Sequence, residues 1–106
     1  MEPLPERPLT LEEIQGYVAR MEVERGFSDS TLIEQALKLA EETGEVCKAV
    51  RKHSVLGVDP HSTVGPLGEE LADVLIYVAA LANRAGIDLS HALRDKETVN
   101  ENRTWR

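Results

Sequence analysis

Two short acidic segments of the sequence carry carboxylates at a spacing that suits a shared metal ion. The first is Glu41–Glu45, which reads EETGE, and the second is Glu69–Asp73, which reads EELAD. On a helix, residues three positions apart lie about 4.5 Å apart along the axis and about 60° apart around it, so both side chains can reach one ion. Two facing helices would then supply four carboxylates, and the candidate metal ligands are Glu42, Glu45, Glu70 and Asp73.

The apolar surroundings of these carboxylates favour a binding role over simple solvation. Asp73 is the only charged residue in the run Leu71–Ala82, and a buried carboxylate without a partner costs several kcal/mol. Glu42 precedes the expected core residue Val46 by four positions, which is about 40° around the helix. A single E-x-x-E pair is common on solvated helices, whereas two pairs on helices that pack together favour a shared cation.

The ligand type indicates the metal. All-oxygen carboxylate sites suit Mg²⁺, with Mn²⁺ as a possible substitute. Di-iron bundle proteins need Glu-x-x-His pairs, which the sequence lacks, and we expect the scattered His53, His61 and His91 in loop or surface positions. The sequence therefore predicts a magnesium site and disfavours an iron oxidase.

A polar stripe near the end of the chain could bind phosphate. Lys96, Asn100 and Arg103 follow the spacing i, i+4, i+7, which places an ammonium, an amide and a guanidinium on one helical face. The alternative is a solvated stripe near a helix C-terminus, where the helix dipole favours cations. The residues alone leave both interpretations open.

Capping residues and apolar periodicity predict four helices that position these groups. Capping boxes begin at Thr10 and Thr31, with Ser28 and Ser30 as alternative caps for the second helix. The predicted helices run from Thr10 to near Gly26, from Thr31 to about Lys52, from Pro66 to Ala85 before Gly86, and from Asp88 to about Asn102. Residues 53–65 form the one expected long loop, and residues 1–9 an expected flexible segment.

The third predicted helix is apolar nearly all round, so it must be covered on most of its sides. A chain of 106 residues removes only about 60 to 70 % of its extended surface from water, so its own core is thin. We therefore expect a single all-α domain over residues 1–106, a four-helix bundle completed by forming a homodimer or homotetramer.

Composition excludes several classes of protein. The net charge of −7 and the pI near 4.9 argue against binding a nucleic-acid polymer, which requires a basic surface. Cys47 is the only cysteine, so no intrachain disulfide can form. The segment Met1–Pro8 lacks the features of a secretion signal, and the run Leu71–Ala82 is shorter than the roughly 20 residues of a membrane span. We expect a cytoplasmic protein.

The paired acidic signature resembles that of the MazG-like all-α nucleoside triphosphate pyrophosphohydrolases, in which EExxE is followed by ExxD. Here it consists of Glu41, Glu42 and Glu45, then Glu70 and Asp73. The flanking text KLAEETGEV and EELADVLIYVAALANRAGIDL and the closing KETVNENR are also similar to that family. The resemblance covers roughly Leu32 to Arg103.

The resemblance implies Mg²⁺-dependent cleavage of a nucleoside triphosphate between its α and β phosphates, giving the monophosphate and pyrophosphate, and a role in clearing non-canonical nucleotides. Glu42, Glu45, Glu70 and Asp73 match the metal-ligand positions. Glu41, or a ligand glutamate such as Glu45, is then the candidate to orient or deprotonate the attacking water. By the same resemblance Lys96, Asn100 and Arg103 would contact the triphosphate.

Other functions fit the same residues. Phosphoribosyl-ATP pyrophosphohydrolase and dimeric deoxyuridine triphosphatase use similar carboxylate pairs in this fold, and a helical interaction module could hold a structural ion without catalysis. The preferred base also stays open. Tyr17, Met21 and Phe27 could line a base pocket, although core packing is the more common role of such residues at helical spacing.

Overall fold

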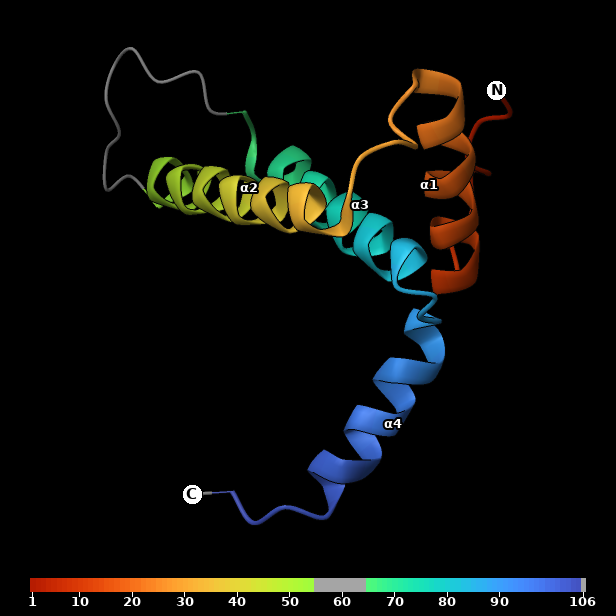
Figure 1. Ribbon diagram of the computed structural model, residues 1–106. Coiled ribbons are helices and arrows are strands. Elements are labelled where there is room, and N and C mark those ends of the chain that lie inside the picture. Colours follow the sequence, from red (N-terminus) through yellow and green to blue (C-terminus); the bar gives the residue numbers. More distant parts are fainter. Residues whose placement is uncertain (55–64, 106) are drawn as a thin grey trace.

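The computed structural model describes residues 1–54 and 65–105, and these residues form four α-helices and no strand. The helices are α1 (Leu11–Arg25), α2 (Leu32–His53), α3 (Leu67–Arg84) and α4 (Leu89–Glu101), as Figure 1 shows. The prediction of an all-α fold is confirmed, and each helix begins and ends within two residues of its expected bounds. His53, expected in the loop, ends α2, and residues 55–64 of the predicted loop, with His61, lie outside the described residues.

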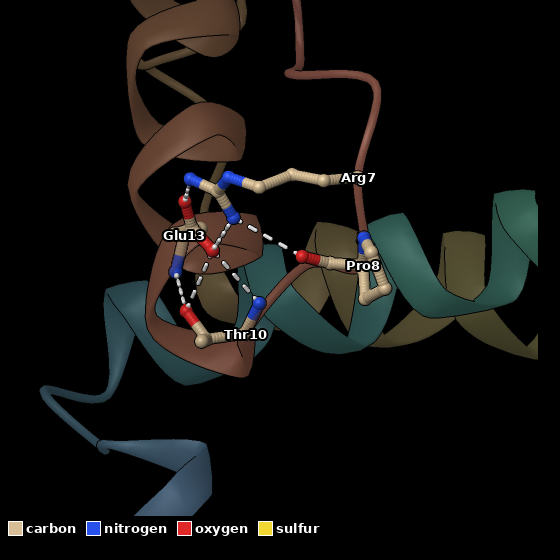
Figure 2. Close-up of polar contacts among 4 residues, drawn as sticks. All are labelled: Arg7, Pro8, Thr10 and Glu13. Atoms are coloured by element: carbon tan, nitrogen blue, oxygen red, sulfur yellow. Dashed lines mark hydrogen bonds and ion pairs between the residues drawn. The ribbon is translucent and has the colours of Figure 1, made fainter.

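Local capping fixes the start of α1 (Figure 2). The Thr10 hydroxyl accepts a hydrogen bond from the Glu13 amide at 3.1 Å, and the Glu13 carboxylate accepts one from the Thr10 amide at 2.9 Å. Arg7 donates to both carboxylate oxygens of Glu13, at 3.0 and 2.5 Å. These bonds to Arg7 are the main reason that the pKa of Glu13 falls to about 2. Thr31 and Glu34 form the same reciprocal pair at the start of α2.

The two longest helices, α2 and α3, run side by side in opposite directions (Figure 1) and make the most extensive contacts in the chain. The antiparallel pairing brings the middle of α2 next to the first half of α3. The acidic segments at Glu41–Glu45 and Glu69–Asp73 therefore face each other across this pair.

Helix α1 packs across the second half of α3. The buried core there consists of Val18 and Met21 from α1 and of Ala79 and Ala80 from α3. Alanine side chains are small, so the two helix backbones can approach closely at this crossing. Ile14, Tyr17, Ile76 and Leu89 pack around this cluster.

Helix α4 extends away from the α2–α3 pair (Figure 1) and contains no buried residue. Its start is held by Gln15 of α1, whose side-chain oxygen accepts from the Leu89 amide at 2.9 Å and whose amide nitrogen donates to the Ile87 carbonyl at 2.8 Å. Asn83 of α3 donates to the Gln15 backbone carbonyl at 2.9 Å. The start of α4 is thus held by a side chain of α1, which Asn83 of α3 in turn positions.

Two glycine substitutions are expected to shift stability in opposite directions. Gly26 ends α1 with a φ of 79°, in the left-handed region that costs other residues about 1 kcal/mol, so Gly26→Ala should destabilise by about that amount. Gly44 lies inside α2, and an added Cβ there would meet no atom within 4 Å. Gly44→Ala should therefore stabilise by about 0.5–1 kcal/mol. Urea unfolding of both variants measures the difference, and equal effects would contradict the backbone argument.

No helix in residues 1–54 and 65–105 is both long enough and apolar enough to cross a membrane.

Candidate metal centre

Three of the four candidate ligands meet in the structure. Glu42 from α2 and Glu70 and Asp73 from α3 each offer one carboxylate oxygen, and these oxygens all lie within 4.8 Å of one another. Glu70 and Asp73 project from the same face of α3 because they are three residues apart on a helix. Glu42 reaches them from the antiparallel helix, so tertiary packing completes the group.

Glu70 is held in place more firmly than the other two. The residue is buried, with 9 % of its surface exposed, and its Oε1 accepts a hydrogen bond from the Gly65 amide at 3.0 Å. A Cβ added at Gly65 would lie 3.0 Å from that same oxygen. A side chain at position 65 would therefore shift the Glu70 carboxylate by a few tenths of an ångström.

The group concentrates negative charge. Burial raises the pKa of Glu42, and the neighbouring charges of Asp73, Glu70, Glu45 and Glu41 raise it further, in that order. A divalent cation would relieve both effects, because it replaces lost solvation with direct coordination and cancels the repulsion. Three converging carboxylate oxygens are hard ligands that fit Mg²⁺ or Mn²⁺, so the residues present suit a divalent metal.

Acidification is expected to weaken cation binding earlier than for isolated carboxylates. Because the pKa of Glu42 lies above its ordinary 4.5, a proton competes with the cation over mildly acidic pH. In the metal-free protein, the stability that protonated Glu42 contributes is present below pH 4.5 and is lost as the pH rises through the raised pKa. Mn²⁺ titration calorimetry at about pH 7 and about pH 5 tests this competition, and equal affinities at the two values would contradict it.

The remaining acidic candidates lie beside this group. Glu45 is half-buried but is not one of the three converging carboxylates, and its Oε1 lies 3.5 Å from the Lys48 ammonium. Glu41 is exposed. Both are close enough for their charges to raise the pKa of Glu42. Their roles as a fourth ligand or as the group that activates water remain predictions.

The basic stripe of α4 is not brought to the acidic group within one described chain, because α4 extends away from α2 and α3 (Figure 1). Arg103 stacks over the Trp105 ring at 4.5 Å from its centre, and the Trp105 ring nitrogen donates to the Asn100 carbonyl at 3.2 Å. The Asn100 side-chain oxygen is buried without a hydrogen-bond partner in the described structure. Lys96 is exposed, and phosphate binding by the three residues stays a prediction.

A pocket of about 290 Å³ adjoins the metal centre at Asp73, between α1, α2 and α3. Met21 and Phe27, two of the three residues considered for a base pocket, line it, whereas Tyr17 packs against the core instead. Gln35 and Lys38, which were not among the residues predicted for a base pocket, also line this pocket. Their signal was present, because they precede Glu42 by seven and four residues and so share its helical face.

The chain is similar to known proteins in sequence and in structure. Residues 30–100 match the MazG nucleotide pyrophosphohydrolase domain. A "dATP/dGTP diphosphohydrolase" of Cyanophage S-2L is 37 % identical over 68 residues, which are 64 % of this chain and 52 % of that protein. A "dATP/dGTP diphosphohydrolase" of Salmonella phage PMBT28 is 32 % identical over 96 residues, 91 % of this chain and 28 % of that protein. The chain thus spans about half the length of the first relative and about a quarter of the second.

Two solved structures share the fold over most of their length. One is the Cyanophage S-2L MazG-like pyrophosphohydrolase bound to dGDP and three catalytic Mn²⁺ ions per active site. It superposes with a TM-score of 0.69 at 29 % identity, and the matched region covers 93 % of this chain and 85 % of the cyanophage chain. The other is iMazG of Vibrio DAT 722, which superposes with a TM-score of 0.63 at 31 % identity. The matched region covers 92 % of this chain and 100 % of the Vibrio chain. With the family match extending from residue 30 to residue 100, the chain belongs to the MazG nucleotide pyrophosphohydrolase domain family.

Proposed function

We propose that the protein is a nucleoside triphosphate pyrophosphohydrolase that depends on divalent metal, Mg²⁺ with Mn²⁺ as a substitute. It would cleave between the α and β phosphates and release a nucleoside monophosphate and pyrophosphate. The observation that carries the proposal is the convergence of Glu42, Glu70 and Asp73 oxygens within 4.8 Å of one another. Membership of the MazG family and the Mn²⁺ ions of the cyanophage structure support it.

Different residues of the chain would bind the metal and activate the attacking water. Glu42, Glu70 and Asp73 would hold the metal, with Glu45 as a further ligand on the border of the group. A bound divalent cation would neutralise phosphate charge and lower the pKa of the attacking water. Glu41 or Glu45 would orient that water and accept its proton.

Phosphate binding by α4 is part of the proposal and has a structural consequence. Lys96, Asn100 and Arg103 would contact the triphosphate, but α4 stands apart from the acidic group of its own chain (Figure 1). This role therefore needs a second copy of the chain, in the homodimer or homotetramer expected from the sequence. Large apolar side chains on three helices are more than 40 % exposed and would be covered there: Ile33, Leu37, Leu71, Leu75, Leu93 and Val99.

The nucleotides named for the relatives indicate a substrate class for this chain. Both phage relatives are named for dATP and dGTP, and the cyanophage structure holds dGDP, so we propose purine deoxynucleoside triphosphates, canonical or modified, as the substrate class. A nucleotide pool of this kind fits the cytoplasmic location expected from the sequence.

A substrate panel tests the proposal. Canonical, oxidised and methylated nucleoside triphosphates, dUTP and phosphoribosyl-ATP are incubated with Mg²⁺ or Mn²⁺, and the products are identified as monophosphate plus pyrophosphate. Turnover should disappear on chelation of the metal and return on its addition. Absence of turnover with every substrate and both metals would favour the alternative of a non-catalytic helical module.

A further inference from the structure

Gln35 is a buried residue whose polar end has no hydrogen-bond partner among the described residues. Three polar or charged side chains are buried in the described residues: Glu22, Gln35 and Glu70. Glu22 pairs with Arg84, and Glu70 belongs to the metal centre and accepts from Gly65. Gln35 as a residue is only 6 % exposed, yet its carboxamide makes no hydrogen bond to any described residue. The amide atoms themselves keep some accessible surface, because the Asn100 oxygen is the one fully buried side-chain atom without a partner in the described residues. A polar group that is free of protein partners in an otherwise buried residue is available to a ligand.

The Gln35 carboxamide is not sealed in the core, because the residue lines the pocket next to the metal centre. Met21, Ile76 and Tyr77 contribute apolar surface to the same pocket. Its volume of about 290 Å³ is near the lower end of the range for small-molecule sites, about 300 to 1,000 Å³. The pocket thus suits a nucleoside in size, and it is too small for a whole triphosphate.

The pocket and the metal centre are arranged in line along α2. Gln35 and Glu42 lie seven residues apart on one helical face, which is about 10 Å along the axis. Asp73 belongs to both sites. Lys38 lines the pocket between them and has no ion-pair partner among the described residues. A nucleotide whose phosphates lie at the metal centre would extend its base toward Gln35.

We propose that this pocket receives the nucleobase and that Gln35 is a specificity-determining residue for it, an inference that rests on the proposed function of the metal centre. The carboxamide presents a hydrogen-bond donor and an acceptor side by side, as adenine requires at its amino group and adjacent ring nitrogen. Met21, Ile76 and Tyr77 supply the apolar surface on which the base packs. A base that fills the pocket without pairing would cover the amide and leave it unsatisfied, and this penalty is the source of discrimination.

The first test compares bases in Gln35→Met, which keeps the length of the side chain and removes the amide. We expect kcat/KM for the preferred base to fall about 10- to 100-fold and the ratios between dATP, dGTP, dCTP and dTTP to change. Lys52→Met is the matched control, because it places the same side chain at an exposed position of the same helix outside the pocket. An equal fall for all four substrates, or no fall, would overturn the assignment.

The second test does not depend on turnover or on the folding of a variant. The Gln35 side-chain amide signals of the ¹⁵N-labelled wild-type protein are followed by NMR while dAMP, dGMP, dCMP, dTMP or 2-deoxyribose 5-phosphate is added. We expect shifts that differ between bases and are absent with the sugar phosphate. Such shifts in a protein without turnover would sustain the pocket assignment while the proposed activity fails. Identical responses to all five compounds, or none, would overturn the assignment even if the enzyme is active.

Discussion

Glu42→Gln is expected to reduce nucleotide hydrolysis by more than about 100-fold while the helical fold survives. Losing a group that only supports a metal ligand already costs about 10- to 100-fold in metal affinity or activity, and Glu42 is the one member of the converging group supplied by α2. Asp73→Asn should have the same effect from α3. Steady-state release of pyrophosphate measures the loss, and turnover near the wild-type level in either variant would refute the metal assignment.

The same substitution should have opposite effects on stability with and without metal. Without metal, Glu42→Gln is expected to stabilise the protein at neutral pH, because burial and four neighbouring carboxylates raise the pKa of Glu42 and disfavour its charge. With the cation at about 100 times its dissociation constant, the wild type gains about 2.7 kcal/mol, or about 10 to 20 °C in melting temperature. The variant should gain much less.

Glu69→Gln is the matched control for these measurements. It removes one charge from the same EELAD segment, but Glu69 is exposed and is not one of the three converging carboxylates. We expect its activity and its metal-induced rise in melting temperature to resemble those of the wild type. A loss as large as that of Glu42→Gln would mean that total acidity matters and the geometry of three oxygens does not.

Arg84→Met is expected to destabilise the fold by about 3–5 kcal/mol, the usual cost of removing one partner of a buried ion pair. Arg84 forms an ion pair with Glu22 across α3 and α1, and the two side chains are only 15 % and 9 % exposed. Its guanidinium also donates to the carbonyls of Ser30 at 2.6 Å and Phe27 at 3.0 Å. The Arg84 side chain thus connects the end of α3 to α1 and to the segment between α1 and α2.

Urea unfolding of a small series of variants separates these contributions. Glu22→Leu combined with Arg84→Met should recover part of the loss, because no unpaired charge then remains buried. Arg51→Met, at an exposed position of α2, should change stability by less than about 0.5 kcal/mol. If Arg84→Met lowered the free energy of unfolding by less than about 1 kcal/mol, the Arg84–Glu22 pair would behave as an exposed surface ion pair. The proposed contribution of Arg84 to stability would then be wrong.

Helix positions were predictable because the signals that set them are local. Thr10 and Thr31 bond to glutamates three residues later, and Gly26 and Gly86 adopt positive φ at helix ends. These interactions lie within one turn of the chain, so residue type and spacing decide them. The pairing of Glu70 with Asp73 follows in the same way from helix geometry.

Membership of the metal group was only partly predictable. Spacing along α2 allowed both Glu42 and Glu45 to face α3, and the structure brings Glu42 to Glu70 and Asp73 while Glu45 lies beside Lys48. Which of the two converges depends on the rotation of α2 about its axis. That rotation is set by how side chains of both helices pack, and a single sequence does not reveal it.

The sequence by itself determined the four helices, the acidic pairs and the chemistry that hard oxygen ligands permit, because each depends on neighbours a few residues apart. Only the tertiary structure decided that α4 leaves the other helices, where Gln15 of α1 holds its first turn. It also decided that Gln35 lines the pocket adjoining the metal centre, with its amide unpaired by any described residue. Both depend on contacts between segments far apart in the chain, and such contacts exist only once the helices have packed.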